Sequence, residues 1–218
     1  MSAGVRRRVA VLISGRGSNM ASLIEAARRP DYPAEIALVA SNRPDAGGLA
    51  HAEAAGIATA IVDYKAFPDR AAFEDALDGV LRRHGAELIA LAGFMRVFTA
   101  GFVERWTGRM LNIHPSLLPL FKGLHTHRQA LEAGVLVHGC TVHFVVPELD
   151  SGPIVAQAAV PVLPGDTENT LAVRILKQEH VIYPRALAIV ASGRARLDAG
   201  RVSFCETWEN RGALVVPD

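Results

Sequence analysis

Three polar side chains in this 218-residue chain, Asn112, His114 and Asp150, are of the types that acyl transfer requires. Asn112 and His114 are two residues apart in an apolar run, so a strand there would place both on one face. Pro115 removes a backbone donor and favours an extended backbone at His114, so we expect the strand to end there. Open α/β sheets hold ligands at such strand ends. An amide that donates to an oxyanion would then lie beside an imidazole that moves a proton.

Asp150 begins a segment, residues 150–153, that has the composition of a tight turn. An aspartate in such a turn commonly caps its own turn, which is one interpretation of this residue. The other interpretation is that the fold brings the carboxylate beside His114. A nearby carboxylate favours the protonated imidazole, which is the form that a general acid needs.

Residues 9–13 form an aliphatic run, which is typical of a strand buried on both faces. A glycine-containing loop follows this run. Gly17, Ser18 and Asn19 end this loop, and a helical pattern begins at Met20. Free amides at a helix start favour a phosphate, although the loop lacks the third glycine of a dinucleotide site and the lysine of a P-loop. The alternative is a tight turn in which Ser18 or Asn19 caps the helix.

Strand and helix patterns alternate along the rest of the chain. We expect strands at 35–41, 59–62, 88–92 and 110–114, then at 138–146 and 154–162. Helices are expected at 46–55, at 69–84 with Asp69 as cap, and at 168–190 with a kink or break near Tyr183 because Pro184 follows. This order predicts an α/β fold: one domain with an open, mostly parallel twisted sheet and helices on both faces.

Segment 93–98 contains Met95, Arg96, Val97 and Phe98 and follows the fourth predicted strand. Exposed apolar groups there could form a slot for a flat ring. The alternative is that they pack under the next helix, and for Met95 and Phe98 individually we favour core packing. Arg70 could reach an anion, or it is a solvated helix charge.

Composition excludes several classes of protein. The formal net charge of +1 provides no broad basic field for nucleic acid. Cys140 and Cys205 form no Cys-x-x-Cys pair, which favours reduced thiols in a cytosolic protein. The apolar run after Arg8 is too short for a signal peptide or a membrane span. Five of the eight histidines lie between His114 and His143, but without a metal-ligand spacing, so we expect no metal.

Five segments together resemble the 10-formyltetrahydrofolate-dependent formyltransferases, and specifically the branch that formylates glycinamide ribonucleotide in purine synthesis. They are GRGSN (15–19), GFMR (93–96), NIHPSLLP (112–119) with GLHTH (123–127), ELDSGP (148–153) and QEH (178–180). The resemblance covers residues 9–184 or so. It departs from the family at Arg16, Ser151 and Lys122, none of which removes a proposed catalytic group.

The resemblance implies one formyltransferase domain over residues 1–218. Residues 1–110 or so would form the nucleotide-substrate half, and 111–218 the folate-binding and catalytic half. It implies that catalysis uses Asn112, His114 and Asp150. Glycinamide ribonucleotide would be bound by Gly17, Ser18, Asn19, Lys177, Gln178 and Glu179. The formyl folate would be bound by Arg70, Met95, Arg96, Val97, Phe98, Asn112, Val146, Pro147, Glu148, Leu149 and Asp150.

The implied reaction is direct attack of the ribonucleotide amine on the formyl group of 10-formyltetrahydrofolate, the co-substrate, through a tetrahedral intermediate. We expect a cytoplasmic monomer or homodimer with two small-molecule substrates and no metal, nucleic acid or membrane partner. One rival is formyltetrahydrofolate deformylase, which usually carries an extra amino-terminal domain for which we expect no room before Val9. Methionyl-tRNA formyltransferase needs an added RNA-binding domain. An inactive nucleotide-binding module would not need Asn112, His114 and Asp150.

Overall fold

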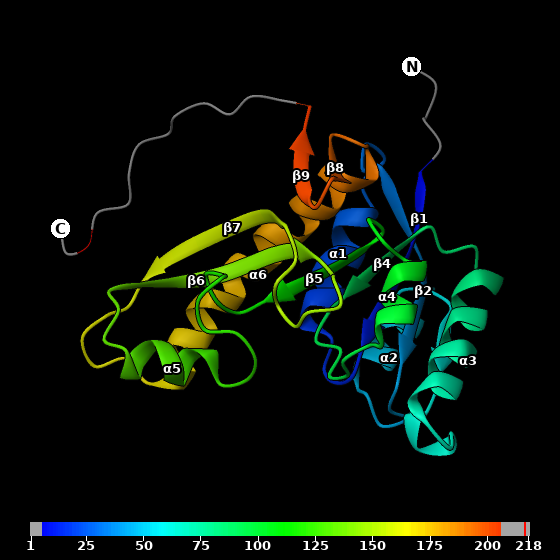
Figure 1. Cartoon of the computed structure of the whole chain (residues 1–218), viewed down its shortest axis with the longest axis horizontal. Coiled ribbons are helices and arrows are strands. Elements are labelled where there is room, and N and C mark those ends of the chain that lie inside the picture. The colour runs from blue at the N-terminus through cyan, green and yellow to red at the C-terminus, as the bar shows by residue number, and fades with distance from the viewer. Residues whose placement is uncertain (1–5, 206–215, 217–218) are drawn as a thin grey trace.

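A seven-stranded sheet forms the centre of the molecule (Figure 1). The computed structural model describes residues 6–205 and 216, so the expected domain limits at residues 1 and 218 lie outside it. The strands are β1 (Arg7–Ile13), β2 (Ala34–Ser41), β3 (Thr59–Ile61), β4 (Leu88–Leu91), β5 (Met110–His114), β6 (Val137–Phe144) and β7 (Ile154–Pro161). Their order is β3-β2-β1-β4-β5-β6-β7, and neighbours among the first five are parallel. β6 is antiparallel to β5 and β7 is antiparallel to β6, which confirms an open, mostly parallel sheet.

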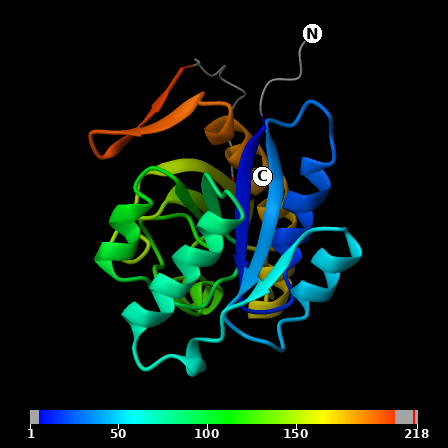
Figure 2. The same ribbon diagram turned by 90° about the vertical axis from the view of Figure 1, so that its right-hand side faces the viewer.

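Helices cover both faces of this sheet, as predicted (Figure 2). One apolar core contains residues of α1 (Ser18–Ala27), α2 (Gly48–Ala54) and α6 (Glu168–Ala191). A second core, on the other face, contains residues of α3 (Arg70–Arg83) and α4 (Ala100–Arg105). The remaining elements are η1 (Tyr64–Ala66), α5 (Thr126–Glu132), β8 (Ala195–Asp198) and β9 (Arg201–Phe204). Because the central strands face a core on each side, their sequences are aliphatic without alternation.

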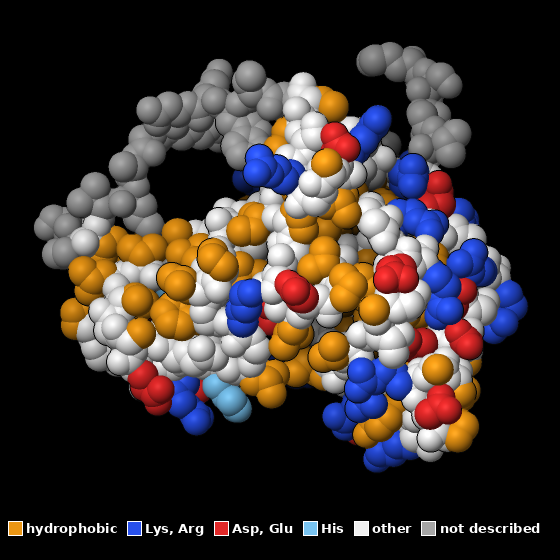
Figure 3. All heavy atoms as spheres, viewed as in Figure 1, with side chains coloured by type: hydrophobic (Ala, Val, Ile, Leu, Met, Phe, Trp, Pro, Cys, Tyr) orange, Lys and Arg blue, Asp and Glu red, His pale blue; other side chains and the backbone are white. Residues whose placement is uncertain are grey.

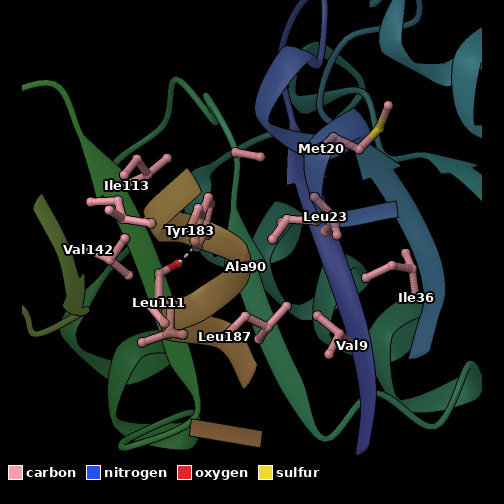
Figure 4. Close-up of a cluster of buried hydrophobic side chains, with 14 of the residues drawn as sticks. Val9, Met20, Leu23, Ile36, Ala90, Leu111, Ile113, Val142, Tyr183 and Leu187 are labelled. Atoms are coloured by element: carbon pink, nitrogen blue, oxygen red, sulfur yellow. Dashed lines mark hydrogen bonds between the residues drawn. The ribbon is translucent and has the colours of Figure 1, made fainter. Parts of the chain in front are cut away.

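The helix α6 lies across the sheet with Tyr183 fully buried against it (Figure 4). The Tyr183 hydroxyl lies 3.0 Å from the carbonyl oxygen of Leu91 and 3.3 Å from that of Leu111, so it joins α6 to β4 and β5. Burial raises the pKa of this phenol well above its usual value, so the hydroxyl stays protonated and can donate.

We predicted a kink or a break near Tyr183, and the break is wrong because α6 continues through Pro184 to Ala191. Proline removes one hydrogen bond from a helix interior, which ordinarily costs about 3 kcal/mol. Here the residues on both sides are tied to the rest of the molecule. Tyr183 is bonded to the sheet, and the Pro184 carbonyl accepts a hydrogen bond of 2.7 Å from the Tyr32 hydroxyl. Tertiary packing therefore holds the helix together where local propensity would end it.

Charged side chains of both signs are interspersed on the face shown in Figure 3. This agrees with the formal net charge of +1 for the whole chain. None of the helices formed by the described residues combines the length and hydropathy needed to cross a bilayer.

Candidate active site

The candidate site forms where parallel strands end at one edge of the sheet. β1, β4 and β5 lead into Ser14, Ala92 and Pro115, so the loops that follow them meet there. β6 runs back along β5 with Asn112 opposite His143 and His114 opposite Thr141. This pairing places the Asn112 and His143 side chains together, since paired residues point to the same face of a sheet.

His114 is buried, with 6% of its surface exposed. Its Nδ1 lies 3.5 Å from Oδ2 of Asp150. Its Nε2 lies 3.0 Å from the backbone carbonyl oxygen of Phe121, to which it donates because a carbonyl only accepts. Both neighbours of the ring accept hydrogen bonds when Asp150 is ionised. The ring therefore has an acceptor on each side, of which only the Phe121 carbonyl forms a hydrogen bond with it.

Asp150 takes part in a contact between loops and does not cap its own turn. Its Oδ2 accepts a hydrogen bond of 2.9 Å from the backbone N–H of Gly123, in the loop that follows β5. Its other oxygen lies 4.0 Å from Nε2 of His143. Asp150 also has a φ of 48°, in the left-handed region that few residues other than glycine adopt. In this conformation the Asp150 carboxylate lies between the imidazoles of His114 and His143.

Asn112 is held by His143, a buried residue for which our sequence analysis assigned no role. The His143 Nδ1 lies 2.9 Å from the Phe144 carbonyl and must donate to it, so in the neutral ring Nε2 is an acceptor. Burial lowers the pKa of His143, which favours this neutral form. The Asn112 amide nitrogen lies 3.2 Å from Nε2 and donates to it. One N–H of the amide is thereby fixed, and the second remains to serve a ligand.

A second polar pair, Asn19 and Glu179, joins α1 to α6. The Asn19 amide nitrogen donates a hydrogen bond of 2.6 Å to Glu179. Both residues are buried, and burial raises the pKa of the Glu179 carboxyl. The Asn19 Oδ1 is buried and has no hydrogen-bond partner among residues 6–205. Because an unsatisfied buried acceptor is costly, this oxygen is suited to a donor group on a ligand.

The glycine loop enters α1 through Gly17, whose φ of 75° lies in the left-handed region. No side chain caps this helix, so the alternative in which Ser18 or Asn19 acts as the cap is wrong. A Cβ on Gly17 would lie 3.1 Å from the Gly48 Cα, a tight contact that adds to the strain of the positive φ for any other residue. The first amides of α1 therefore remain open to a ligand, with Ser18 exposed beside them.

One cavity of about 920 Å³ contains both polar clusters and the predicted slot. Its walls include Asn19, Met95, Arg96, Val97, Phe98, Asn112, His114, Val146, Pro147, Glu148, Leu149, Asp150 and Glu179. This volume is within the range of small-molecule sites.

Met95 is 64% exposed, so our preference for core packing of this residue is wrong. Phe98 does pack in the core, with its ring stacked on Phe94 and Phe102. The two residues differ because Phe94, Phe98 and Phe102 form the stack that anchors the loop, which turns Met95 and Val97 outward. The Arg96 guanidinium lies over the Tyr64 ring, 4.0 Å from its centroid.

Five predicted site residues do not line this cavity: Gly17 and Ser18, at the start of α1, and Arg70, Lys177 and Gln178. Arg70 is exposed at the start of α3. Lys177 is exposed and Gln178 half-buried on α6, while Glu179 between α1 and α6 is buried. A helix turns by about 100° per residue, so three consecutive residues cannot all face one ligand.

Sequence reasoning missed His143 and the two backbone groups that hold the catalytic pair, the Phe121 carbonyl and the Gly123 N–H. The alternation of residues 138–146 did place Thr141 and His143 on one face. The register against β5 was needed to set His143 opposite Asn112.

Two of the departures from the family pattern meet in space. The Lys122 ammonium group donates a hydrogen bond of 2.6 Å to the Ser151 hydroxyl. This contact links the loop after β5, whose Phe121 carbonyl accepts from His114, to the loop between β6 and β7, which contains Asp150. The third departure, Arg16, is exposed.

Comparison with known proteins gives a consistent result. A sequence model described as formyl transferase matches residues 7–187. The phosphoribosylglycinamide formyltransferase of Escherichia coli K12 is 46% identical over 87% of this chain and 89% of its own length. The human trifunctional purine biosynthetic protein adenosine-3 is 51% identical over 88% of this chain. The chain spans only about a fifth of that relative's length, 19%.

Solved structures agree with these sequence matches. A glycinamide ribonucleotide transformylase from Symbiobacterium toebii superposes with a TM-score of 0.90 at 47% identity, covering 93% of this chain and 96% of that one. A phosphoribosylglycinamide formyltransferase from Brucella melitensis has a TM-score of 0.83 at 56% identity, covering 86% and 97%. The chain belongs to the formyl transferase family.

Proposed function

We propose that this chain transfers the formyl group of 10-formyltetrahydrofolate to the amine of glycinamide ribonucleotide in purine synthesis. The products are formylglycinamide ribonucleotide and tetrahydrofolate. One observation carries the proposal: a single cavity contains a buried acceptor pair, the Asn112, His114 and Asp150 cluster, and an apolar slot. Relatives that carry this function in their names match most of the chain.

The ribonucleotide fits the end of the cavity beside α1. Its phosphate would bind the open amides at Gly17, Ser18 and Asn19, since the start of a helix carries partial positive charge. The unpartnered Asn19 Oδ1 and the Glu179 carboxylate are acceptors and would take ribose hydroxyls or the amine. The amine would thereby be directed towards Asn112 and His114.

The formyl folate fits the opposite end, between two loops. Met95, Val97 and Leu149 offer exposed apolar surface on either side of the slot, which suits a flat ring. Arg96 also lines the cavity and would meet the acidic part of the folate. Arg70 does not line the cavity, so it would contribute only to the binding of a longer acidic tail on the folate.

The chemistry follows from the atoms that the site presents. The amine nitrogen bonds to the formyl carbon, whose oxygen becomes an oxyanion. The free N–H of Asn112 and the protonated His114 stabilise that oxygen. The bond from N10 to carbon then breaks, and a proton removed from the amine is delivered to N10. His114 assists this transfer, and its separation of 3.5 Å from Asp150 leaves the Nδ1 proton able to reach a reacting atom.

The same proposal covers the other partners and the location. The two substrates are small metabolites of the cytoplasm, where we place the protein as a monomer or homodimer. No nucleic-acid partner is included, because the net charge of +1 gives little electrostatic attraction for a polyanion.

A two-substrate assay tests the proposal. Tetrahydrofolate formation is followed with 10-formyltetrahydrofolate alone and after addition of glycinamide ribonucleotide. We expect release that depends on the ribonucleotide and equals the formylated product mole for mole. An equal rate without the ribonucleotide would identify a deformylase, and no turnover with both substrates would identify an inactive module.

A further inference from the structure

One buried hydroxyl connects loops that lie beside the cavity. Ser14 follows β1, is 5% exposed, and lies where the loops after β1, β2 and β4 come together. Its Oγ donates a hydrogen bond of 2.5 Å to Oδ1 of Asn42, the residue after β2. The same Oγ accepts a hydrogen bond of 2.8 Å from the backbone N–H of Met95. The backbone N–H of Ser14 also donates to the Gly93 carbonyl at 3.2 Å.

These bonds place Ser14 between two loops, each of which would bind a different substrate in the proposed reaction. Ser14 begins the segment that leads through Gly17 into α1, where the ribonucleotide phosphate would bind. Met95 belongs to the loop that forms one wall of the folate slot. The sheet order puts β1 beside β4, with β1 leading to a helix on one face and β4 to a helix on the other. Ser14 therefore lies at the crevice between β1 and β4, where the strand order of the sheet reverses, and bridges it.

Neighbouring hydrogen bonds orient the Ser14 hydroxyl and stabilise its contact with the Met95 amide. A hydroxyl has a single proton, and the Asn42 acceptor fixes its direction, which leaves the oxygen lone pairs facing the Met95 amide. The Asn42 carbonyl oxygen lies 3.5 Å from the amide nitrogen of Tyr64, and the Arg96 guanidinium stacks on the Tyr64 ring. On the other side, the Gly15 carbonyl accepts a hydrogen bond of 3.0 Å from Gly48 at the start of α2. The two loops are thus joined by one connected set of polar contacts.

We propose that Ser14 is a positioning residue that couples the two substrate sites. Binding of the ribonucleotide further restrains the loop after β1, and through Ser14 this further restrains the Met95 amide and the slot wall where the folate binds. Reciprocity requires the folate to strengthen ribonucleotide binding by the same factor. This inference rests on the proposed function, because it assigns one substrate to each loop.

The test uses the product tetrahydrofolate, which carries no formyl group, so that both ligands bind without reaction. Calorimetry measures the Kd of tetrahydrofolate with and without saturating glycinamide ribonucleotide. We expect the ribonucleotide to tighten binding about tenfold in the parent chain. In Ser14→Ala the ratio should fall to about twofold or less, since the Met95 N–H loses its partner. Ser192→Ala, which removes a hydroxyl at the end of α6, should keep the parent ratio.

Kinetics separate positioning from general damage. In Ser14→Ala the KM for the formyl donor should rise about tenfold while kcat changes less, because Ser14 contacts none of the reacting groups. The coupling is overturned if the ribonucleotide leaves the Kd of tetrahydrofolate unchanged in the parent chain. It is also overturned if the ribonucleotide tightens that Kd as much in Ser14→Ala as in the parent. If the parent transfers formyl groups and the ratio is unaffected, only this inference fails. If the parent does not transfer them, the proposed function fails.

Hydrogen exchange tests the coupling in the parent chain, without relying on the folding of a variant. Glycinamide ribonucleotide alone should slow amide exchange in residues 93–98 as well as 15–19. Tetrahydrofolate alone should slow exchange in residues 15–19. Protection confined to the loop that binds each ligand would overturn the proposal.

Discussion

The two sides of the cavity differ sharply in how they are held. On one side His114, His143 and Asp150 are each less than one-tenth exposed, and each has hydrogen-bonding or ionic contacts within the protein. On the other side Met95, Val97 and Leu149 are 64%, 51% and 53% exposed. The buried side presents fixed polar atoms, and the exposed side presents apolar surface on loops.

This difference matches the separate demands of chemistry and binding. Charge stabilisation needs groups that are oriented before the reaction, so His114 is held by Phe121 and Asp150 by Gly123. Binding of a flat ring needs apolar surface that the ligand itself covers. Changes on the buried side should therefore lower kcat, and changes on the exposed side should raise KM. Each prediction below tests that division.

The largest effect is expected from Asp150→Asn. Asparagine tolerates the positive φ at this position, so the backbone is retained while the charge beside His114 is lost. We expect kcat to fall about a thousandfold, within the range for general acid–base groups, with KM values nearly unchanged. Steady-state kinetics with both substrates varied provide the measurement.

The matched control is Asp31→Asn, which removes a surface carboxylate that pairs with Arg29. It should leave kcat within about twofold of the parent. If Asp150→Asn behaved like this control, the carboxylate would have no part in the chemistry.

A smaller effect is expected on the exposed side from Val97→Asp. A carboxylate in the apolar slot must be desolvated when the folate binds, so the KM for the formyl donor should rise about tenfold. The value of kcat should change little. Val173→Asp on α6 is the control, because Val173 is equally exposed at 50% and does not line the cavity. A drop in kcat with unchanged KM would break the division between the two sides.

The smallest effect on turnover is expected behind the buried side, at His138. This residue is fully buried, neither ring nitrogen has a hydrogen-bond partner in the part of the chain that the structure describes, and burial lowers its pKa to about 4. Between that pH and about 6.5 the unfolded ring binds a proton that the folded ring does not, so stability falls as the pH drops through this window. In His138→Leu, the loss of unfolding free energy between about pH 7 and pH 5 should shrink by about 2 kcal/mol.

Chemical denaturation at the two pH values provides that measurement. The sign is set by the direction of the shift: a lowered histidine pKa makes the folded state less stable in acid. An unchanged pH dependence in His138→Leu would show that this ring is protonated or hydrated in the folded state.

Local patterns predicted much of the fold. The aliphatic run at 9–13 forms a strand buried on both faces, and the Asp69 carboxylate caps α3 by accepting from the Ala72 N–H at 2.8 Å. The strand at Asn112 and His114 ends at His114 as Pro115 requires. Each of these features depends on residues close together in the sequence, so sequence spacing was sufficient.

The missed features depend on contacts between distant segments. His143 meets Asn112 only through the antiparallel register of β5 and β6, which no local pattern specifies. Met95 is exposed because Phe94, Phe98 and Phe102 stack and turn its side chain outward. Pro184 lies within a continuous helix because Tyr183 and Pro184 are bonded to other elements. In each case tertiary packing overrides the local preference.

The most direct test of the account is the turnover of His114→Ala with saturating 10-formyltetrahydrofolate and glycinamide ribonucleotide. His84→Ala, at the end of α3, serves as the matched control and should keep the parent rate. We predict that His114→Ala binds both substrates but transfers the formyl group at least about a hundredfold more slowly. A rate within about tenfold of the parent, roughly 1.4 kcal/mol of barrier, would contradict a catalytic role for the imidazole.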